Sequence, residues 1–126
     1  MSEGHPQVIR SQEYHVVFSE LIATAQRRGA VTYQEIAKLI GLPLSGNYMG
    51  SRIAGIAGEI STDEHHAGRP MLTSILVNTT GKPGAGFFRL ARTLGRLESS
   101  DRVDELRYWE AEKKATHDAW KVILSN

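Results

Sequence analysis

Residues 32–45 read TYQEIAKLIGLPLS and predict two short helices joined by a tight turn. Thr32, followed three residues later by Glu35, forms a capping box, in which each side chain bonds a backbone N–H group at a helix start. Gly41 ends this helix, and Ser45 is placed to cap the next one. The pair is typical of a helix-turn-helix, although helical domains also use such pairs only for packing.

A longer helix precedes this pair, with Ser11 as its cap and Gly29 as its end. Apolar residues recur along it at spacings of three and four, the pattern of one buried face: Tyr14, Val17, Phe18, Leu21, Ile22 and Ala25. Residues 1–10 are predicted to form a flexible arm and lack the pattern of a secretion signal.

The second helix of the pair is predicted to end near Ile60, and a polar loop follows over residues 61–70. Residues 71–78 are short, apolar and β-branched, which predicts a strand. Residues 79–86 (TTGKPGAG) predict a glycine-rich loop, from which Phe87 and Phe88 return to the core. A strand and such a loop after a helix-turn-helix are typical of a wing.

Two more helices are predicted, over residues 88–97 and 101–124. The predicted fold class is therefore mainly α (α+β), a winged helix-turn-helix with a small β-wing and extra C-terminal helices. The winged domain covers residues 11–97, and an amphipathic C-terminal helix within residues 98–126 packs on the same domain.

The composition narrows the classes of function. A chain of 126 residues suits one compact domain. The absence of cysteine excludes disulfides, zinc–thiolate sites and thiol nucleophiles, and it suits the cytoplasm, where we expect the protein. No run of 18 apolar residues predicts a membrane span. The formal net charge of +1 is low for a nucleic-acid binder, so an argument for DNA depends on where the charge lies.

The second helix of a helix-turn-helix presents its first exposed residues to base edges in the major groove. Without the apolar stripe of this helix, the outward residues are Asn47, Tyr48, Ser51, Arg52 and Gly55. Asparagine pairs with adenine, and arginine pairs with guanine or phosphate. The helix is also rich in glycine and alanine, which lets either DNA or a neighbouring helix approach its backbone closely.

Basic residues accompany the predicted wing. Lys82 lies at the tip of the glycine-rich loop, where a lysine serves either phosphate binding or solubility. Three arginines then follow at i, i+3 and i+7 on one face of the next helix: Arg89, Arg92 and Arg96. Such a stripe can clamp a phosphate backbone. The alternative is a solvated face in which Arg96 pairs with a nearby acid, Glu98 or Asp101.

These motifs together resemble a known family. VTYQEIA at 31–37, LIG at 39–41, Pro43, the glycine-rich helix, RP at 69–70, the apolar strand and the glycine-rich wing are similar to the C-terminal domain of O6-alkylguanine DNA alkyltransferases and alkyltransferase-like proteins. The resemblance implies a winged helix that binds the DNA minor groove and flips a damaged base. It matches Tyr33 to the tyrosine that assists flipping, and it places Arg52 near the arginine that fills the vacated base stack.

The reactive motif of that family departs in this chain. Pro-Cys-His-Arg-Val reads PMLTS at residues 70–74, so Met71 replaces the nucleophilic cysteine and Leu72 the histidine. A thioether forms no thiolate, which excludes alkyl transfer. The alkyltransferase-like branch also lacks the cysteine but keeps the histidine and the arginine. The expectation carried over is therefore the fold and a DNA surface, without lesion recognition.

The predicted function is binding of duplex DNA without catalysis, in regulation, DNA modification or defence. Residues 63–66 (DEHH) are the one dense titratable cluster, and no separated metal ligands, phosphate loop or nucleophile elbow accompany it. We therefore expect no enzyme, metal or cofactor. The alternative is a protein-interaction module, in which Tyr108, Trp109 and Trp120 of the last helix form a homodimer or dock a protein partner.

Overall fold

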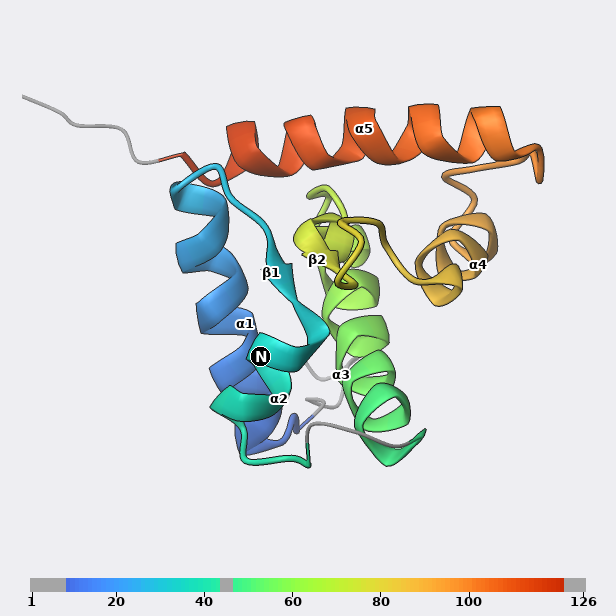
Figure 1. The fold of residues 1–126 in the computed structure, drawn as a ribbon. Coiled ribbons are helices and arrows are strands. Elements are labelled where there is room, and N and C mark those ends of the chain that lie inside the picture. The colour runs from blue at the N-terminus through green and yellow to red at the C-terminus, as the bar shows by residue number, and fades with distance from the viewer. Residues whose placement is uncertain (1–8, 44–46, 122–126) are drawn as a thin grey trace, which may run out of the picture.

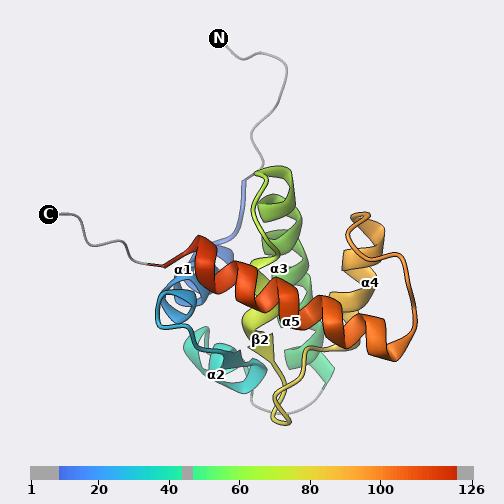
Figure 2. The same cartoon turned by 90° about the horizontal axis from the view of Figure 1, so that it is seen from above.

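A computed structural model describes residues 9–43 and 47–121, without the side chains of residues 47–49, and over these ranges the chain is mainly helical. The α-helices are α1 (Gln12–Gln26), α2 (Tyr33–Leu39), α3 (Asn47–His66), α4 (Ala85–Thr93) and α5 (Arg102–Ala119). The helix α5 lies across one end of the others, from α4 to α1 (Figures 1 and 2). None of the described helices has the length and apolar character needed to cross a membrane.

The centre of the molecule is a short segment that α1, α3 and α5 surround. It consists of a 3-10 helix, η1 (Leu72–Ile75), followed by the strand β2 (Leu76–Val77), and every residue in it is buried. The strand β2 pairs in parallel with β1 (Val31–Thr32). One apolar cluster joins α1, α2, α3 and η1, and a second joins Met71 to α4 and α5.

The start of the chain folds as predicted. Ser11 caps α1 by accepting a hydrogen bond from the backbone of Tyr14 at 3.0 Å. Both bonds of the capping box are formed, from the Glu35 backbone to Thr32 Oγ1 at 3.1 Å and from the Thr32 backbone to Glu35 Oε1 at 2.8 Å. Gly41 then leaves the helix with a φ of +77°, a conformation that glycine adopts without strain. The predicted cap Ser45 lies outside the described residues.

The strand predicted over residues 71–78 is wrong for most of its length. Thr32 is already the cap of α2, so β1 offers a pairing partner only to Leu76 and Val77. The residues before them coil into η1, where side chains rather than a ladder satisfy the polar groups. Thr73 Oγ1 lies 2.6 Å from Ser61 Oγ, and Ser74 Oγ lies 2.9 Å from the Thr116 hydroxyl.

The predicted β-wing is not a hairpin in the part of the chain that the structure describes, where the sheet is the parallel β1–β2 pair. Residues 78–84 form a turn in which Asn78 Oδ1 accepts from the backbone N–H groups of Thr80 and Lys82, at 2.9 and 3.2 Å. The chain then enters α4 directly instead of returning as a strand. This helix spans Ala85–Thr93 rather than residues 88–97, because Gly95, with a φ of +76°, turns the chain away.

The polar loop predicted over residues 61–70 is also wrong, because α3 continues to His66. Ser61 and Glu64 face inward, where Thr73 and Arg69 provide hydrogen bonds, so their polarity does not mark the surface. The last helix begins after its cap Asp101, as predicted, and its expected end at residue 124 lies outside the described range.

The capping box gives a test of the local code. Replacing Thr32 with alanine (Thr32→Ala) removes the oxygen that accepts from the Glu35 backbone. We expect the free energy of unfolding, measured by urea denaturation, to fall by about 1 kcal/mol, as for other lost N-caps. Thr79→Ala, at an exposed loop threonine, is the control and should change it by less than about 0.5 kcal/mol. Equal losses in the two variants would contradict a role for the cap.

Candidate nucleic-acid interface

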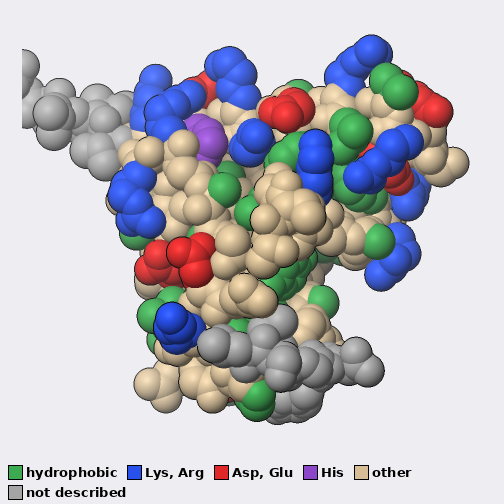
Figure 3. Space-filling model, viewed as in Figure 1, with side chains coloured by type: hydrophobic (Ala, Val, Ile, Leu, Met, Phe, Trp, Pro, Cys, Tyr) green, Lys and Arg blue, Asp and Glu red, His purple; other side chains and the backbone are tan. Residues whose placement is uncertain are grey.

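A groove of about 530 Å³ lies between the start of α2, the helix α3 and the helix α4, and the turn after β2 closes one side. Its walls are mostly carbon, from Ala54 and Ala57 of α3 and from Phe87 and Leu90 of α4. Figure 3 shows this face of the molecule, hollowed over α3, with basic side chains over α4 and α5. The groove is therefore a small apolar hollow beside a basic margin.

Tyr33 forms part of the groove wall and is half-buried. Its hydroxyl lies so close to Gly84 that a Cβ atom there would stand 3.1 Å away, so the contact depends on glycine. Burial raises the pKa of Tyr33, and a hydrogen bond from the Gly84 backbone opposes part of the rise. The hydroxyl therefore stays neutral at physiological pH and acts as a hydrogen-bonding group at the edge of the groove.

The outward face of α3 carries small side chains. Gly50, Ser51, Ala54 and Gly55 are exposed, whereas Ile53 and Ile56 turn to the core. A helix with such a face allows another backbone to approach closely. The side chains of two predicted DNA contacts, Asn47 and Tyr48, lie outside the described residues.

Arg52 lies on α3 and forms an ion pair with Glu13 of α1. Its charge is therefore partly neutralised within the fold, and Glu13 competes for the guanidinium that the sequence assigned to DNA.

The three arginines predicted to form one stripe do not line one helical face, because α4 ends at Thr93 and Arg96 lies beyond it. Arg92 Nη1 contacts Glu105 Oε2 at 2.8 Å, and this hydrogen bond lowers the pKa of Glu105. Arg89 is exposed, lines the groove and has no acidic partner among the described residues. Of the three, it alone keeps a charge at the groove.

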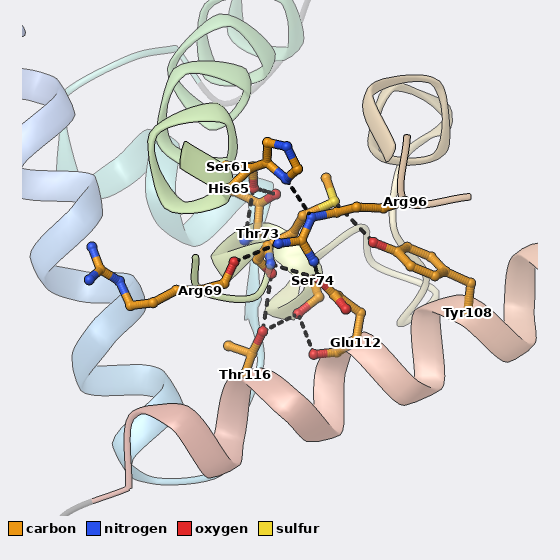
Figure 4. Close-up of polar contacts among 10 residues, drawn as sticks. Ser61, His65, Arg69, Thr73, Ser74, Arg96, Tyr108, Glu112 and Thr116 are labelled. Atoms are coloured by element: carbon orange, nitrogen blue, oxygen red, sulfur yellow. Dashed lines mark hydrogen bonds and ion pairs between the residues drawn. The ribbon is translucent and has the colours of Figure 1, made fainter. Parts of the chain in front are cut away.

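Arg96 holds the interior together (Figure 4). Its Nη1 donates to Glu112 Oε2 at 2.8 Å, its Nε to His65 Nδ1 at 2.9 Å, and its Nη2 to the carbonyl oxygen of Arg69 at 2.8 Å. The predicted alternative, pairing with Glu98 or Asp101, named the wrong acids, since the partner comes from α5. All three bonds tie separate segments together, so this arginine is structural.

Lys82, the predicted tip of the wing, is exposed in the turn that borders the groove. Its Nζ lies 5.6 Å from the centroid of the Trp109 ring, and that of Lys113 lies 4.3 Å away. The indole π-system attracts both ammonium groups, which leaves two cations near one another at this margin.

The position that the resemblance gives to the nucleophile lies in the core. Met71 is fully buried, and its backbone N–H donates to Glu112 Oε2 at 2.8 Å. The hydroxyl of Tyr108 lies 3.3 Å from Met71 Sδ, and that of Thr116 donates to the Met71 carbonyl oxygen at 3.1 Å. Met71 thus takes part in packing and does not line the groove.

Glu112 is absent from the residues that the sequence singled out. It follows the buried Trp109 by three residues and precedes the buried Thr116 by four, which places it on the inward face of α5. A carboxylate at such a position indicates a buried partner, and this was the available signal. The apolar groove has no comparable signal, because its walls come from segments distant in sequence.

The titratable cluster at residues 63–66 is divided among separate contacts. Asp63 accepts from Arg10 and, at 2.6 Å, from the Tyr14 hydroxyl, while Glu64 pairs with Arg69. Burial alone would raise the pKa of Asp63, but the hydrogen bonds from Arg10 and Tyr14 outweigh it and the pKa is lowered. Within the described ranges, no group of three or more histidine and acidic residues is arranged to hold a metal ion.

Comparisons with protein-family models, with curated proteins and with solved structures found no match to this chain. The resemblance to alkyltransferases accordingly remains an expectation from sequence motifs.

Two arginines near α4 should behave oppositely when removed. Arg96→Ala leaves the nearly buried Glu112 carboxylate without its cation, so we expect the free energy of unfolding to fall by about 2 kcal/mol. Arg89→Ala should change it by less than about 0.5 kcal/mol. In a Glu112→Gln background the loss from Arg96→Ala should shrink, because no buried charge is stranded. Urea denaturation of the four proteins checks this, and equal losses in both backgrounds would argue against the ion pair.

The contacts of Asp63 predict a dependence of stability on pH. Since its pKa is lower in the folded state, the stabilisation is complete above the unfolded pKa of about 3.9 and is lost as pH falls through the folded pKa. The gap in unfolding free energy between the native chain and Asp63→Asn should therefore be widest above about pH 5 and narrow below it. Urea titrations at a series of pH values measure this gap. A gap that stays constant down to acid pH would refute the assignment.

Proposed function

We propose that this protein binds duplex DNA without catalysis, using α2, the turn after it and α3 as a helix-turn-helix, with residues 78–84 in the place of a wing. The observation that carries the proposal is the bare outward face of α3 beside the basic margin of the groove. A duplex approaching this face meets small side chains and hydrogen-bonding groups such as Ser51, while cations beside it meet phosphate oxygens.

The charge available for phosphates comes from Arg89 and Lys82, neither of which has an acidic partner in the part of the chain that the structure describes. Arg92 and Arg96 contribute to stability instead, because their guanidinium groups bind acids of α5. Few free cations predict modest affinity with a shallow dependence on salt, which agrees with the net charge of +1.

The alternative function, a protein-interaction module built on the aromatic residues of α5, has less support. Trp109 is buried, and its Nε1 donates to the Ser74 carbonyl oxygen at 2.8 Å. Tyr108 packs against Phe87, and Trp120 packs edge-on against Phe18. These rings contact the chain itself, so this helix does not present them as a docking surface.

The DNA proposal predicts a double variant with a selective defect. Lys82→Ala/Arg89→Ala should weaken binding to a fluorescently labelled duplex and reduce the slope of log affinity against log salt by about two, one for each lost phosphate contact. Fluorescence anisotropy titrations at a series of salt concentrations measure both quantities. Thermal melting should be unchanged, because both side chains are exposed.

The matched control is Arg107→Ala/Lys121→Ala, which removes the same charge from exposed positions on or just after α5. It should retain most of the affinity if the groove margin binds DNA. An equal defect in the two double variants would reduce the effect to net charge. Absence of binding by the native chain at micromolar protein in low salt would reject the proposal, and dimerisation in light scattering would then favour the alternative.

A further inference from the structure

The groove is a space that the chain leaves unfilled. Protein interiors and well-packed surfaces rarely leave apolar hollows of this size, and a volume of about 530 Å³ lies within the range of small-molecule sites. Glycines keep it open, because a Cβ atom built on Gly50 or Gly58 meets nothing within 4 Å. The walls therefore stand apart without any side chain between them.

The walls determine what kind of molecule fits. Ala54, Ala57 and Leu90 present carbon, and the ring of Phe87 stands among them, so the body of a ligand must be apolar. Glycine positions on both sides of the groove provide flat backbone rather than knobs, which favours a planar body. Polar groups lie at the edge, where Tyr33 and Asn78 belong to the lining.

A single charge faces this space. Of the described residues that line the groove, Arg89 is the charged one, and its Nη2 lies 3.7 Å from the position of a Cβ atom on Gly86, another lining residue. The neighbouring Arg92 and Arg96 are bound to acids, whereas Arg89 has no acidic partner in the described ranges. A planar guanidinium at the mouth of an apolar hollow matches a carboxylate, which it binds through two parallel hydrogen bonds.

From this combination we infer that the groove binds a small molecule with a flat apolar body and one carboxylate, which Arg89 holds at the rim. This site goes beyond the proposed binding of DNA and does not require it. A peptide is a poorer fit, because the space is one hollow with one charge rather than a row of pockets.

The test uses 2-naphthoate as the probe and 2-naphthol as its uncharged counterpart, with the full chain and no DNA. Two-dimensional amide NMR should show saturable shifts with 2-naphthoate, centred on the groove residues of α3 and α4. Arg89→Ala should weaken 2-naphthoate by about tenfold and leave 2-naphthol nearly unchanged, because only the charged ligand uses the guanidinium.

Two glycines on α3 provide a matched pair for the location of the site. Gly58 lines the groove, whereas Gly55 is exposed on the same helix outside it, and a Cβ at either position meets nothing within 4 Å. Gly58→Leu should fill the space and weaken 2-naphthoate by at least about tenfold, while Gly55→Leu should leave it unchanged. Ala54→Leu fills the groove from another position and repeats the test if Gly58→Leu melts early.

Three results would overturn the inference. The first is no saturable shift at millimolar 2-naphthoate. The second is equal binding of 2-naphthoate and 2-naphthol with no effect of Arg89→Ala. The third is an equal effect of Gly55→Leu and Gly58→Leu. Because DNA is absent throughout, a failure of the DNA proposal appears only in the anisotropy titrations and a failure of the ligand site only in these.

Discussion

The buried carboxylate of Glu112 is the contact on which the arrangement of the other elements depends. It accepts hydrogen bonds from the Met71 backbone and from Arg96, and so joins α5 to the central segment and to the chain after α4. An unpaired carboxylate at this depth is strongly destabilising, so both donors must be in place when the chain packs. Thr116, one turn further along α5, binds the carbonyl oxygen of the same Met71 and fixes the register of the helix.

This requirement shapes the surface as well as the core. The acids of α5 bind Arg92 and Arg96, two of the three basic groups that follow the turn after β2. The cations that remain at the groove are thereby reduced to Arg89 and its neighbour Lys82. A basic stripe in the sequence is therefore not a basic patch on the molecule, because part of it balances the acidic character of α5.

Local signals in the sequence predict a good part of this fold. Thr32 and Glu35 specify where α2 begins, and Ser11 with the apolar stripe specifies α1, since caps and periodicity act within a few residues. The central segment is different, because β1 is too short to pair residues 72–75 and the hydroxyl partners come from α3 and α5. The turn at Gly95 likewise removes Arg96 from its helix, which spacing alone does not reveal. Long-range partners, rather than propensity, decide these positions.

The composition of α3 shows the same division between core and surface. Glycine costs about 1 kcal/mol relative to alanine inside a helix, and Gly50, Gly55 and Gly58 all lie within this one. The helix is nonetheless long, because Ile53, Ile56 and Ile60 are fully buried and supply packing energy on the opposite face. The small residues stabilise nothing by contact, since Cβ atoms at these glycines would meet open space. Stability alone favours alanine at all three positions, so the bare face of α3 is best explained by a molecule that approaches it.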